Sequence, residues 1–224
     1  AYGTVDTMIA GKFLGTEGLS AVGATSPLIT LISSLFWGFG VGFSIYVAKL
    51  FGAGEFKKIK SAVIVESSLI ALLALFLCGA MILFHKPIFA WLNIEEEIAR
   101  PAFEYFAIYM AGYVFLTLGS NTVFLLNAFG IGTFPFVTSL ISAVLNVCGN
   151  LVGIVWLGWG VKGLAISTVF SGFVVLFAYA FKLKKCFKEM GVENEKPVFK
   201  EAGLKTSLPY AFPNMCQQLV MYLA

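Results

Sequence analysis

The chain alternates between long apolar runs and short polar breaks, and five of the runs are long enough to span a membrane. They cover about residues 27–51, 61–84, 101–128, 134–157 and 161–181. A helix that crosses the hydrocarbon core of a bilayer needs about 20 mostly apolar residues. We predict a helix for each run, because a single segment in lipid must satisfy its own backbone groups and the short alternating strands of a barrel are absent from the pattern.

Two shorter apolar segments flank these five runs. Residues 1–11 are predicted to be the end of an earlier span, and residues 204–224 the start of a later one. The chain has no initiator Met and opens inside an apolar segment, so we expect that its start is truncated. We expect no cleavable signal peptide. The sequence therefore predicts an all-α, polytopic membrane helix bundle.

The composition supports a membrane protein and argues against several other classes. The chain is 59% hydrophobic and 12% charged, with a mean hydropathy of +0.90, whereas soluble domains carry about 25% charged residues. The net charge of +3 does not indicate nucleic-acid binding, because the lysines flank apolar runs. No Ser/His pair, paired carboxylates or metal-ligand spacing is visible, so we predict neither an enzyme nor a metal site. The four cysteines are expected to be free thiols.

Positive residues concentrate on one side of the predicted spans. Eleven of the 15 Lys and Arg residues fall there: Lys49, Lys57, Lys58, Lys60, Lys182, Lys184, Lys185, Lys188, Lys196, Lys200 and Lys205. The other side holds Lys12, Lys86, Arg100 and Lys162. Loops rich in Lys and Arg stay in the cytoplasm. We therefore predict a multi-pass protein of the plasma (inner) membrane with its Lys-rich loops inside.

Asp6 is a lone acid in the first apolar segment. A carboxylate at membrane depth is costly, so it is by default a candidate functional group. We predict that Asp6 takes part in proton or ion coupling. The alternatives are a structural hydrogen bond made by the neutral acid, or a depth misjudged because the chain is truncated.

Four polar residues on other spans are predicted to lie at a similar depth. Helix rise of about 1.5 Å per residue puts Asp6 and Thr168 roughly 9 Å below the surface, and Asn150 about 12 Å below it. Asn146 lies one turn deeper than Asn150 on the same helix face, and Tyr105 is shallower. Buried polar side chains in lipid need partners, so these five residues could bond one another. The ordinary alternative is that the Asn and Thr residues only join neighbouring helices.

Two other acids lie close to basic residues. Glu66 is near Lys60 in the sequence, and Glu104 is one helical turn from Arg100. Residues four apart on a helix can form an ion pair. We expect both acids to form pairs at the membrane interface.

Two prolines predict a kink in the last apolar segment, at Pro209 and Pro213. Gln217 and Gln218 follow the kink. We predict that these two amides face a substrate cavity.

Several short motifs together resemble the multidrug and toxic compound extrusion (MATE) family of transporters. They are the runs at residues 5–11 and 18–23, Gly38-x-Gly40-x-Gly42, the run at residues 48–54, Glu104-Tyr105, Asn146 and the run at residues 163–168. The resemblance implies twelve helices in two pseudo-symmetric six-helix lobes. Residues 1–202 would then be the N-terminal lobe and residues 203–224 the start of helix seven in the second lobe.

The resemblance also implies the roles of the polar residues. Asp6, Tyr105, Asn146 and Thr168 match positions that form a coupling site in the archaeal and related bacterial members. Asn150 departs from the pattern, because those members carry a second carboxylate there. One titratable group instead of two favours a single proton. An amide oxygen also suits sodium, so both ions stay open.

The resemblance therefore implies a cation-coupled antiporter that exports amphipathic organic compounds, including cationic drugs, by alternating access. Its partners would be the substrates, the lipid bilayer and the second lobe, with no cofactor beyond H⁺ or Na⁺. One alternative is a flippase for lipid-linked precursors, which the lack of basic residues deep in the spans disfavours. Others are a non-transporting membrane scaffold and a channel.

Overall fold

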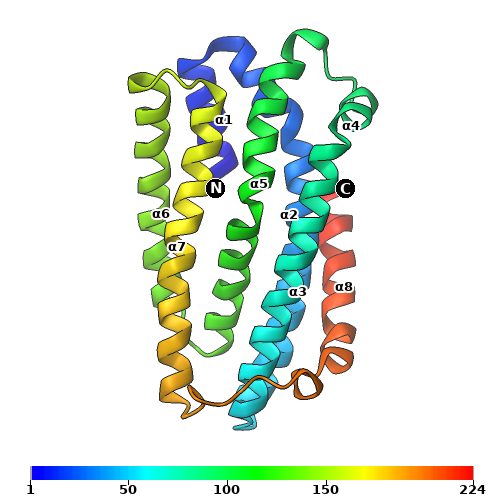
Figure 1. The fold of residues 1–224 in the computed structure, drawn as a ribbon, viewed down its shortest axis with the longest axis vertical. Helices are drawn as coiled ribbons and strands as arrows, with labels where there is room; N and C mark the ends of the chain where they lie inside the picture. The colour runs from blue at the N-terminus through cyan, green and yellow to red at the C-terminus, as the bar shows by residue number, and fades with distance from the viewer. Residues whose placement is uncertain (1, 224) are drawn as a thin grey trace. The chain divides into compact units, whose positions relative to one another are not determined.

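The computed structural model describes residues 2–223, and these residues form helices and connecting turns without a strand. Ala1 and Ala224, which end the two predicted partial spans, lie outside the described residues. The longer helices are α1 (Tyr2–Phe13), α2 (Gly15–Gly52), α3 (Phe56–Leu83), α5 (Glu96–Ala128), α6 (Thr133–Leu151), α7 (Val161–Glu189) and α8 (Leu204–Leu223) (Figure 1). Three short elements join them: α4 (His85–Trp91), a π-helical segment (Val152–Trp156) and a 3₁₀ turn (Phe199–Ala202).

The five predicted spans are confirmed. Among the described residues, five helices are long and apolar enough to cross a membrane: α2, α3, α5, α6 with its π-helical extension, and α7. The all-α prediction is likewise confirmed over residues 2–223. The chain is thus a multi-pass membrane protein.

The start of α2 differs from the prediction, which began this span at Pro27. The helix begins at Gly15 and runs through the proline. Proline removes one backbone donor from the helix ladder, and Ser or Thr side chains can satisfy carbonyls that are freed nearby. Thr25 Oγ1 lies 3.2 Å from the Ala21 carbonyl oxygen and 3.1 Å from that of Val22. All three residues are buried, so packing holds the turns before Pro27.

The Lys-rich segments predicted as loops are helical at their edges. Lys57, Lys58 and Lys60 lie in the first turns of α3, and α7 continues past residue 181 through Lys188. Lysine is a good helix former, and cations in a last turn interact favourably with the helix dipole. The short helix α4 is absent from the prediction, because seven residues show too little periodicity to be recognised.

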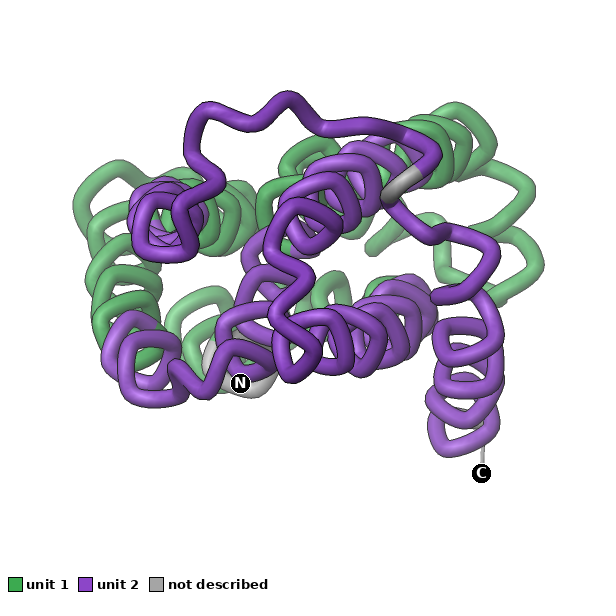
Figure 2. Tube along the Cα trace, turned by 90° about the horizontal axis from the view of Figure 1, so that it is seen from below, with its two compact units in different colours: residues 1–29, 74–116, 139–174 green, residues 30–73, 117–138, 175–224 purple. Residues whose placement is uncertain are grey.

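The chain divides into two compact units, and five helices contribute a segment to each (Figure 2). Unit 1 contains residues 1–29, 74–116 and 139–174, and unit 2 contains residues 30–73, 117–138 and 175–224. The eleven positive residues assigned to one side fall in unit 2, and the other four fall in unit 1. The separation of charge predicted along the sequence is therefore retained in the fold.

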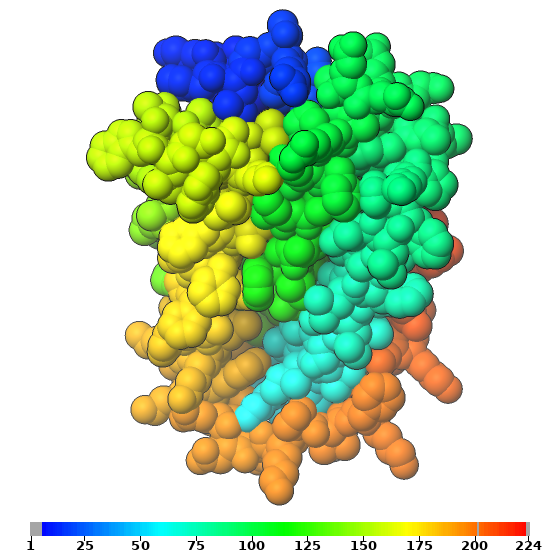
Figure 3. Space-filling view, turned by 45° about the horizontal axis from the view of Figure 1, so that its top comes forward, coloured from blue at the N-terminus to red at the C-terminus, as the bar shows by residue number. Residues whose placement is uncertain are grey.

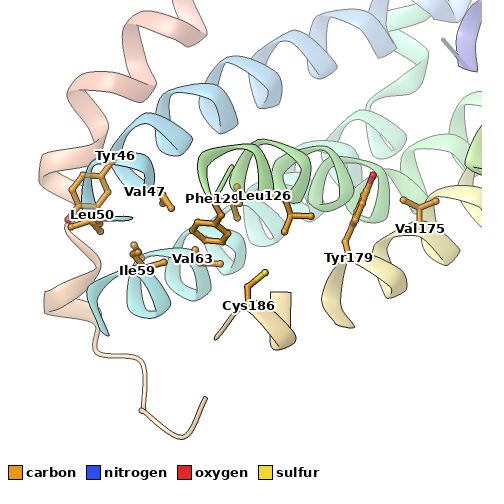
Figure 4. Close-up of a cluster of buried hydrophobic side chains, with 12 residues drawn as sticks. Tyr46, Val47, Leu50, Ile59, Val63, Leu126, Phe129, Val175, Tyr179 and Cys186 are labelled. Atoms are coloured by element: carbon orange, nitrogen blue, oxygen red, sulfur yellow. The ribbon is translucent and has the colours of Figure 1, made fainter. Parts of the chain in front are cut away.

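Unit 2 has a core built from four helices of the bundle. Figure 4 shows Val47 on α2, Val63 on α3, Phe129 at the end of α5 and Cys186 on α7 among its buried members. Cys186 is 2% exposed. Cys186 lies in α7 beyond the predicted run at residues 161–181, so both the helix and its packing extend past that run.

Helices α2 and α8 approach each other closely within unit 2. A Cβ atom added to Gly42 would lie 2.3 Å from the Cα atom of Ala211, and one added to Gly38 would lie 2.4 Å from that of Met215. Small residues allow backbones in membranes to pack at this distance. Lys49 Nζ also donates a hydrogen bond to the Tyr210 hydroxyl, at 2.5 Å. Glycine on one helix face thus fixes where α8 lies on α2.

Candidate functional site

Asp6 lies in unit 1 on α1, which packs against α6 and α7 (Figure 1). Its side chain is fully buried. Oδ1 accepts a hydrogen bond from Asn150 Nδ2 at 2.9 Å. Oδ2 accepts one from Thr168 Oγ1 at 3.0 Å and a longer one from the Tyr105 hydroxyl at 3.4 Å. Three helices thus each direct one donor at a single carboxylate.

Asn146 completes the cluster one turn along α6. Its Nδ2 donates to Thr168 Oγ1 at 2.8 Å, and its Oδ1 accepts from Asn150 Nδ2 at 3.3 Å. Asn146 and Asn150 share a helix face because they are four residues apart. The structure therefore brings together all five residues that the sequence placed at one depth.

Close packing of α6 on α7 positions the amides and the threonine. A Cβ atom added to Gly153 would lie 3.0 Å from the Gly163 Cα atom, and one added to Gly149 would lie 2.9 Å from Ser167 Oγ. Gly153 already belongs to the π-helical segment Val152–Trp156, which directly continues α6. Such segments often occur at functional sites. Nothing in the residue pattern predicted this one, because π-helical turns have no period of their own to detect.

The carboxylate of Asp6 has no ionic partner among the described residues, since none of the ion pairs found there includes it. Burying an unpaired charge is expensive. Hydrogen bonds from neutral donors reduce that cost for the ionised form, and protonation removes the charge. No group of three or more His, Cys, Asp or Glu side chains that could hold a metal ion lies in the described part of the chain. The site is thus built on one acid.

Asn150 keeps one unused acceptor beside this acid. Its Oδ1 is buried and accepts no hydrogen bond from the described residues. Buried polar atoms without a partner are rare and call for a physical explanation. The amide of Asn150 thus donates to Asp6 through Nδ2, while its Oδ1 stays available to accept a hydrogen bond.

Glu66 and Glu104, the two acids predicted to form ion pairs at the membrane interface, differ in their surroundings. Glu104 Oε1 lies 3.4 Å from Arg100 Nε and 3.3 Å from Lys162 Nζ, which confirms the predicted pair and adds a second base. The predicted pair between Glu66 and Lys60 is wrong. Glu66 is fully buried, and no described residue donates to its carboxyl oxygens. Lys60 instead donates to backbone carbonyls.

Three further polar residues lie in unit 2. Gln217 is exposed on α8 and Gln218 is half-buried there, so their role in a substrate cavity stays a prediction. Asn121 on α5 is buried with both amide atoms unpartnered among the described residues. Sequence reasoning missed Asn121, although an amide inside an apolar run was a usable signal.

Comparison with protein families and curated proteins gives one consistent result. The MatE family model matches residues 1–152. A probable multidrug resistance protein, YoeA of Bacillus subtilis, is 29% identical over 191 residues, which cover 80% of this chain and 40% of that protein. An FAD transporter of Shewanella oneidensis is 27% identical over 182 residues, which cover 78% of this chain and 39% of that protein. The chain spans about two fifths of these relatives.

Solved structures share the fold at low sequence identity. An inward-facing multidrug resistance MATE family transporter of the MOP superfamily superposes with a TM-score of 0.87 at 24% identity, over 99% of this chain and 51% of its own. An outward-facing form gives 0.86 at 24% identity, with 99% and 49% covered. The Vibrio cholerae MATE transporter VcmN in its bent form gives 0.89 at 20% identity, with 99% and 50% covered.

Proposed function

Because this chain belongs to the MatE family, whose members are transporters and not enzymes, we propose that it forms the N-terminal lobe of a cation-coupled antiporter. The antiporter exports amphipathic organic compounds and is driven by inward movement of protons. Residues 1–202 form this lobe, and α8 opens the second lobe at residues 203–224. The family assignment also accounts for the predicted absence of an enzyme site.

One observation carries the proposal: a single carboxylate, fully buried and without an ion pair among the described residues, is held by donors from three other helices. An ionisable group inside a membrane protein that no cation neutralises is suited to taking up and releasing a proton. The donors come from α5, α6 and α7, so a change at Asp6 acts on four helices at once, counting α1.

Proton uptake changes the hydrogen bonds that Asp6 can make. The ionised carboxylate only accepts hydrogen bonds, whereas the protonated form also donates one. A new acceptor is then needed, and the Asn150 amide supplies it when it turns over and presents Oδ1. The protonated and ionised forms thus prefer different side-chain arrangements. A ligand shifts a conformational equilibrium only through such a difference in binding to the two states.

Sodium is the second candidate ion, and the unpartnered Asn150 Oδ1 is the observation that favours it. The oxygen atoms of Asp6, Asn146, Asn150 and Thr168 are hard ligands of the kind that hard cations prefer. Sodium would require the donors now directed at Asp6 to turn away. Since Asn150, Thr168 and Tyr105 all donate to the carboxylate, the proton is the better fit.

The substrate class rests on the relatives. The curated relatives are a probable multidrug resistance protein and an FAD transporter. The first supports the export of drugs, with Gln217 and Gln218 as candidate pocket residues. The second points to an anionic dinucleotide as the alternative substrate.

The test is efflux from vesicles that contain the full-length transporter, with proton and sodium gradients imposed separately. We expect export driven by the proton gradient, and its loss in Asp6→Asn, which keeps the size of the side chain but cannot titrate. Glu104→Gln is the matched control, because Glu104 is an acid of unit 1 that is paired and 27% exposed.

Other outcomes each identify a rival. Export driven only by the sodium gradient would show that sodium, and not the proton, is the coupling ion. Normal export by Asp6→Asn would remove Asp6 from coupling. Movement of lipid-linked precursors without an ion gradient would indicate a flippase. Flux that follows the substrate gradient alone would indicate a channel. The absence of any flux would indicate a scaffold.

A further inference from the structure

A groove of about 430 Å³ lies in unit 2 between the first half of α3 and the end of α7. Figure 3 shows this part of α3 in cyan and the end of α7 in orange on one face of the molecule. The segment that follows α7 contributes Glu193 to the rim. The residues that line the groove belong to unit 2, whereas the Asp6 cluster belongs wholly to unit 1.

Two lysines give the rim a net positive charge. Lys60 Nζ donates to the backbone carbonyl oxygens of Val192 and Glu193, at 3.0 Å and 2.5 Å. Carbonyl groups orient an ammonium but do not neutralise it, and an ammonium has three donors, so one stays available. Lys184 Nζ lies 3.8 Å from Glu193 Oε1, and its side chain is 72% exposed. Exposed ion pairs of this kind are weak.

The walls of the groove are mostly apolar, with Ser67 and Ser68 as polar members, and belong to membrane spans. Val63 and Ile64 of α3 face Leu183 and Phe187 of α7, and both helices are long and apolar enough to cross a bilayer. Lys60 directly precedes the apolar run of α3. The groove thus joins a cationic rim at the membrane surface to an apolar channel at the depth of acyl chains.

We propose that this groove binds one anionic phospholipid. Its phosphate contacts Lys60 and Lys184, and an acyl chain lies along Ile64, Leu183 and Phe187. Basic pockets between membrane helices recognise anionic head groups, and the apolar walls distinguish a lipid from a soluble anion. This binding is independent of transport, so it stands or falls separately from the proposed function.

Native mass spectrometry of the purified protein in detergent tests the proposal, with phosphatidylglycerol and phosphatidylcholine of identical acyl chains as probes. We expect retention of phosphatidylglycerol to exceed that of phosphatidylcholine by about tenfold. The double variant Lys60→Gln/Lys184→Gln should lose that preference. Equal retention of the two lipids by the unaltered protein would overturn the proposal.

The control variant is Lys57→Gln/Lys185→Gln, which removes the same charge from the same two helices. Both lysines are exposed, at 70% and 68%, and neither lines the groove. The control should keep the preference for phosphatidylglycerol. If the control loses as much of the preference for phosphatidylglycerol as the groove variant does, general surface charge attracts the lipid and the groove has no role.

A third variant keeps every charge and fills the groove. Ala180 is an exposed small residue in the lining, so Ala180→Trp should displace the acyl chain and lower retention by about tenfold. This variant also guards against a folding defect caused by the loss of Lys60. Unchanged retention in Ala180→Trp, or full competition by inorganic phosphate at equal concentration, would show that the site does not recognise a lipid.

Discussion

The donors to Asp6 differ in what each contributes. Thr168 donates to Asp6 at 3.0 Å and accepts from Asn146 at 2.8 Å, whereas Tyr105 donates one long bond of 3.4 Å. Hydrogen bonds to charged groups contribute about 1.5–3 kcal/mol and weaken as they lengthen. Thr168→Val should therefore reduce proton-driven export and destabilise the fold by about 2 kcal/mol. Tyr105→Phe should have smaller effects on both and destabilise the fold by under about 1 kcal/mol.

Export rates and chemical unfolding of the two variants, measured side by side, check this order. An equal or larger loss in Tyr105→Phe would show that the hydroxyl has a role in proton movement beyond its weak bond. The comparison is matched, since each variant removes one hydroxyl and keeps the bulk of the side chain.

Glu66 is a buried acid that the Asp6 cluster does not use. It is fully buried, and its carboxyl oxygens accept nothing from the described residues. A buried polar group without a partner costs about 1–3 kcal/mol. Glu66→Met should therefore raise the free energy of unfolding by about 1 kcal/mol or more, and Glu66→Gln, which stays polar, should not.

Unfolding of the protein in mixed micelles measures both Glu66 variants. A loss of stability in Glu66→Met would contradict this account of the carboxyl group. Export in Glu66→Met should match the unaltered protein, because the Glu66 carboxyl oxygens have no hydrogen-bond partner among the described residues.

The depth of the polar residues and their grouping were predictable, whereas the partner of each individual hydrogen bond was not. Helix rise placed Asp6, Asn150 and Thr168 in one layer, because each lies a fixed number of residues from the end of its span. The direction of a side chain depends on helix rotation and on neighbours far along the chain. Lys60 illustrates this: it points to the carbonyls of Val192 and Glu193, and so leaves Glu66 alone.

At the scale of helices, the contact of α2 with α8 depends on glycine. Gly42→Ala would place a Cβ atom 2.3 Å from backbone of α8, and forcing an added methyl into tight packing costs about 1–3 kcal/mol. Gly119→Ala is the control within unit 2, because nothing lies within 4 Å of a Cβ added there. It should be neutral or stabilising, since alanine favours helix.

Thermal unfolding of both glycine variants gives the comparison. Equal stability of Gly42→Ala and Gly119→Ala would mean that α2 and α8 separate easily. The sequence shows three closely spaced glycines in this span, Gly38, Gly40 and Gly42, but only the fold shows that α8 packs against Gly38 and Gly42.

Helix ends were less predictable than helices. Apolar runs located all five spans, because length and hydropathy alone determine which segments suit a bilayer. Pro27 suggested an end that packing around Ala21 and Val22 overrides. The Lys-rich continuation of α7 was missed for the opposite reason, since polar residues favour helix there without adding to hydropathy.

At the scale of the whole molecule, the distribution of charge predicts the topology. All eleven positive residues assigned to one side lie in unit 2, so we expect that end in the cytoplasm. In a variant lacking the four native cysteines, Glu96→Cys should react with an impermeant thiol reagent in intact cells. Glu195→Cys should react only after the cells are permeabilised. Labelling in the reverse order would invert the topology.

The contact between α2 and α8 also has a consequence for biosynthesis. Lys49 and Tyr210 are 161 residues apart, and ribosomes add about 5–20 residues each second. Roughly ten to thirty seconds therefore separate the synthesis of the glycine face of α2 from the synthesis of α8, which packs against it. During that interval lipid or the insertion machinery must cover a surface shaped for another helix, so nascent chains are most exposed to mispairing before α8 is made.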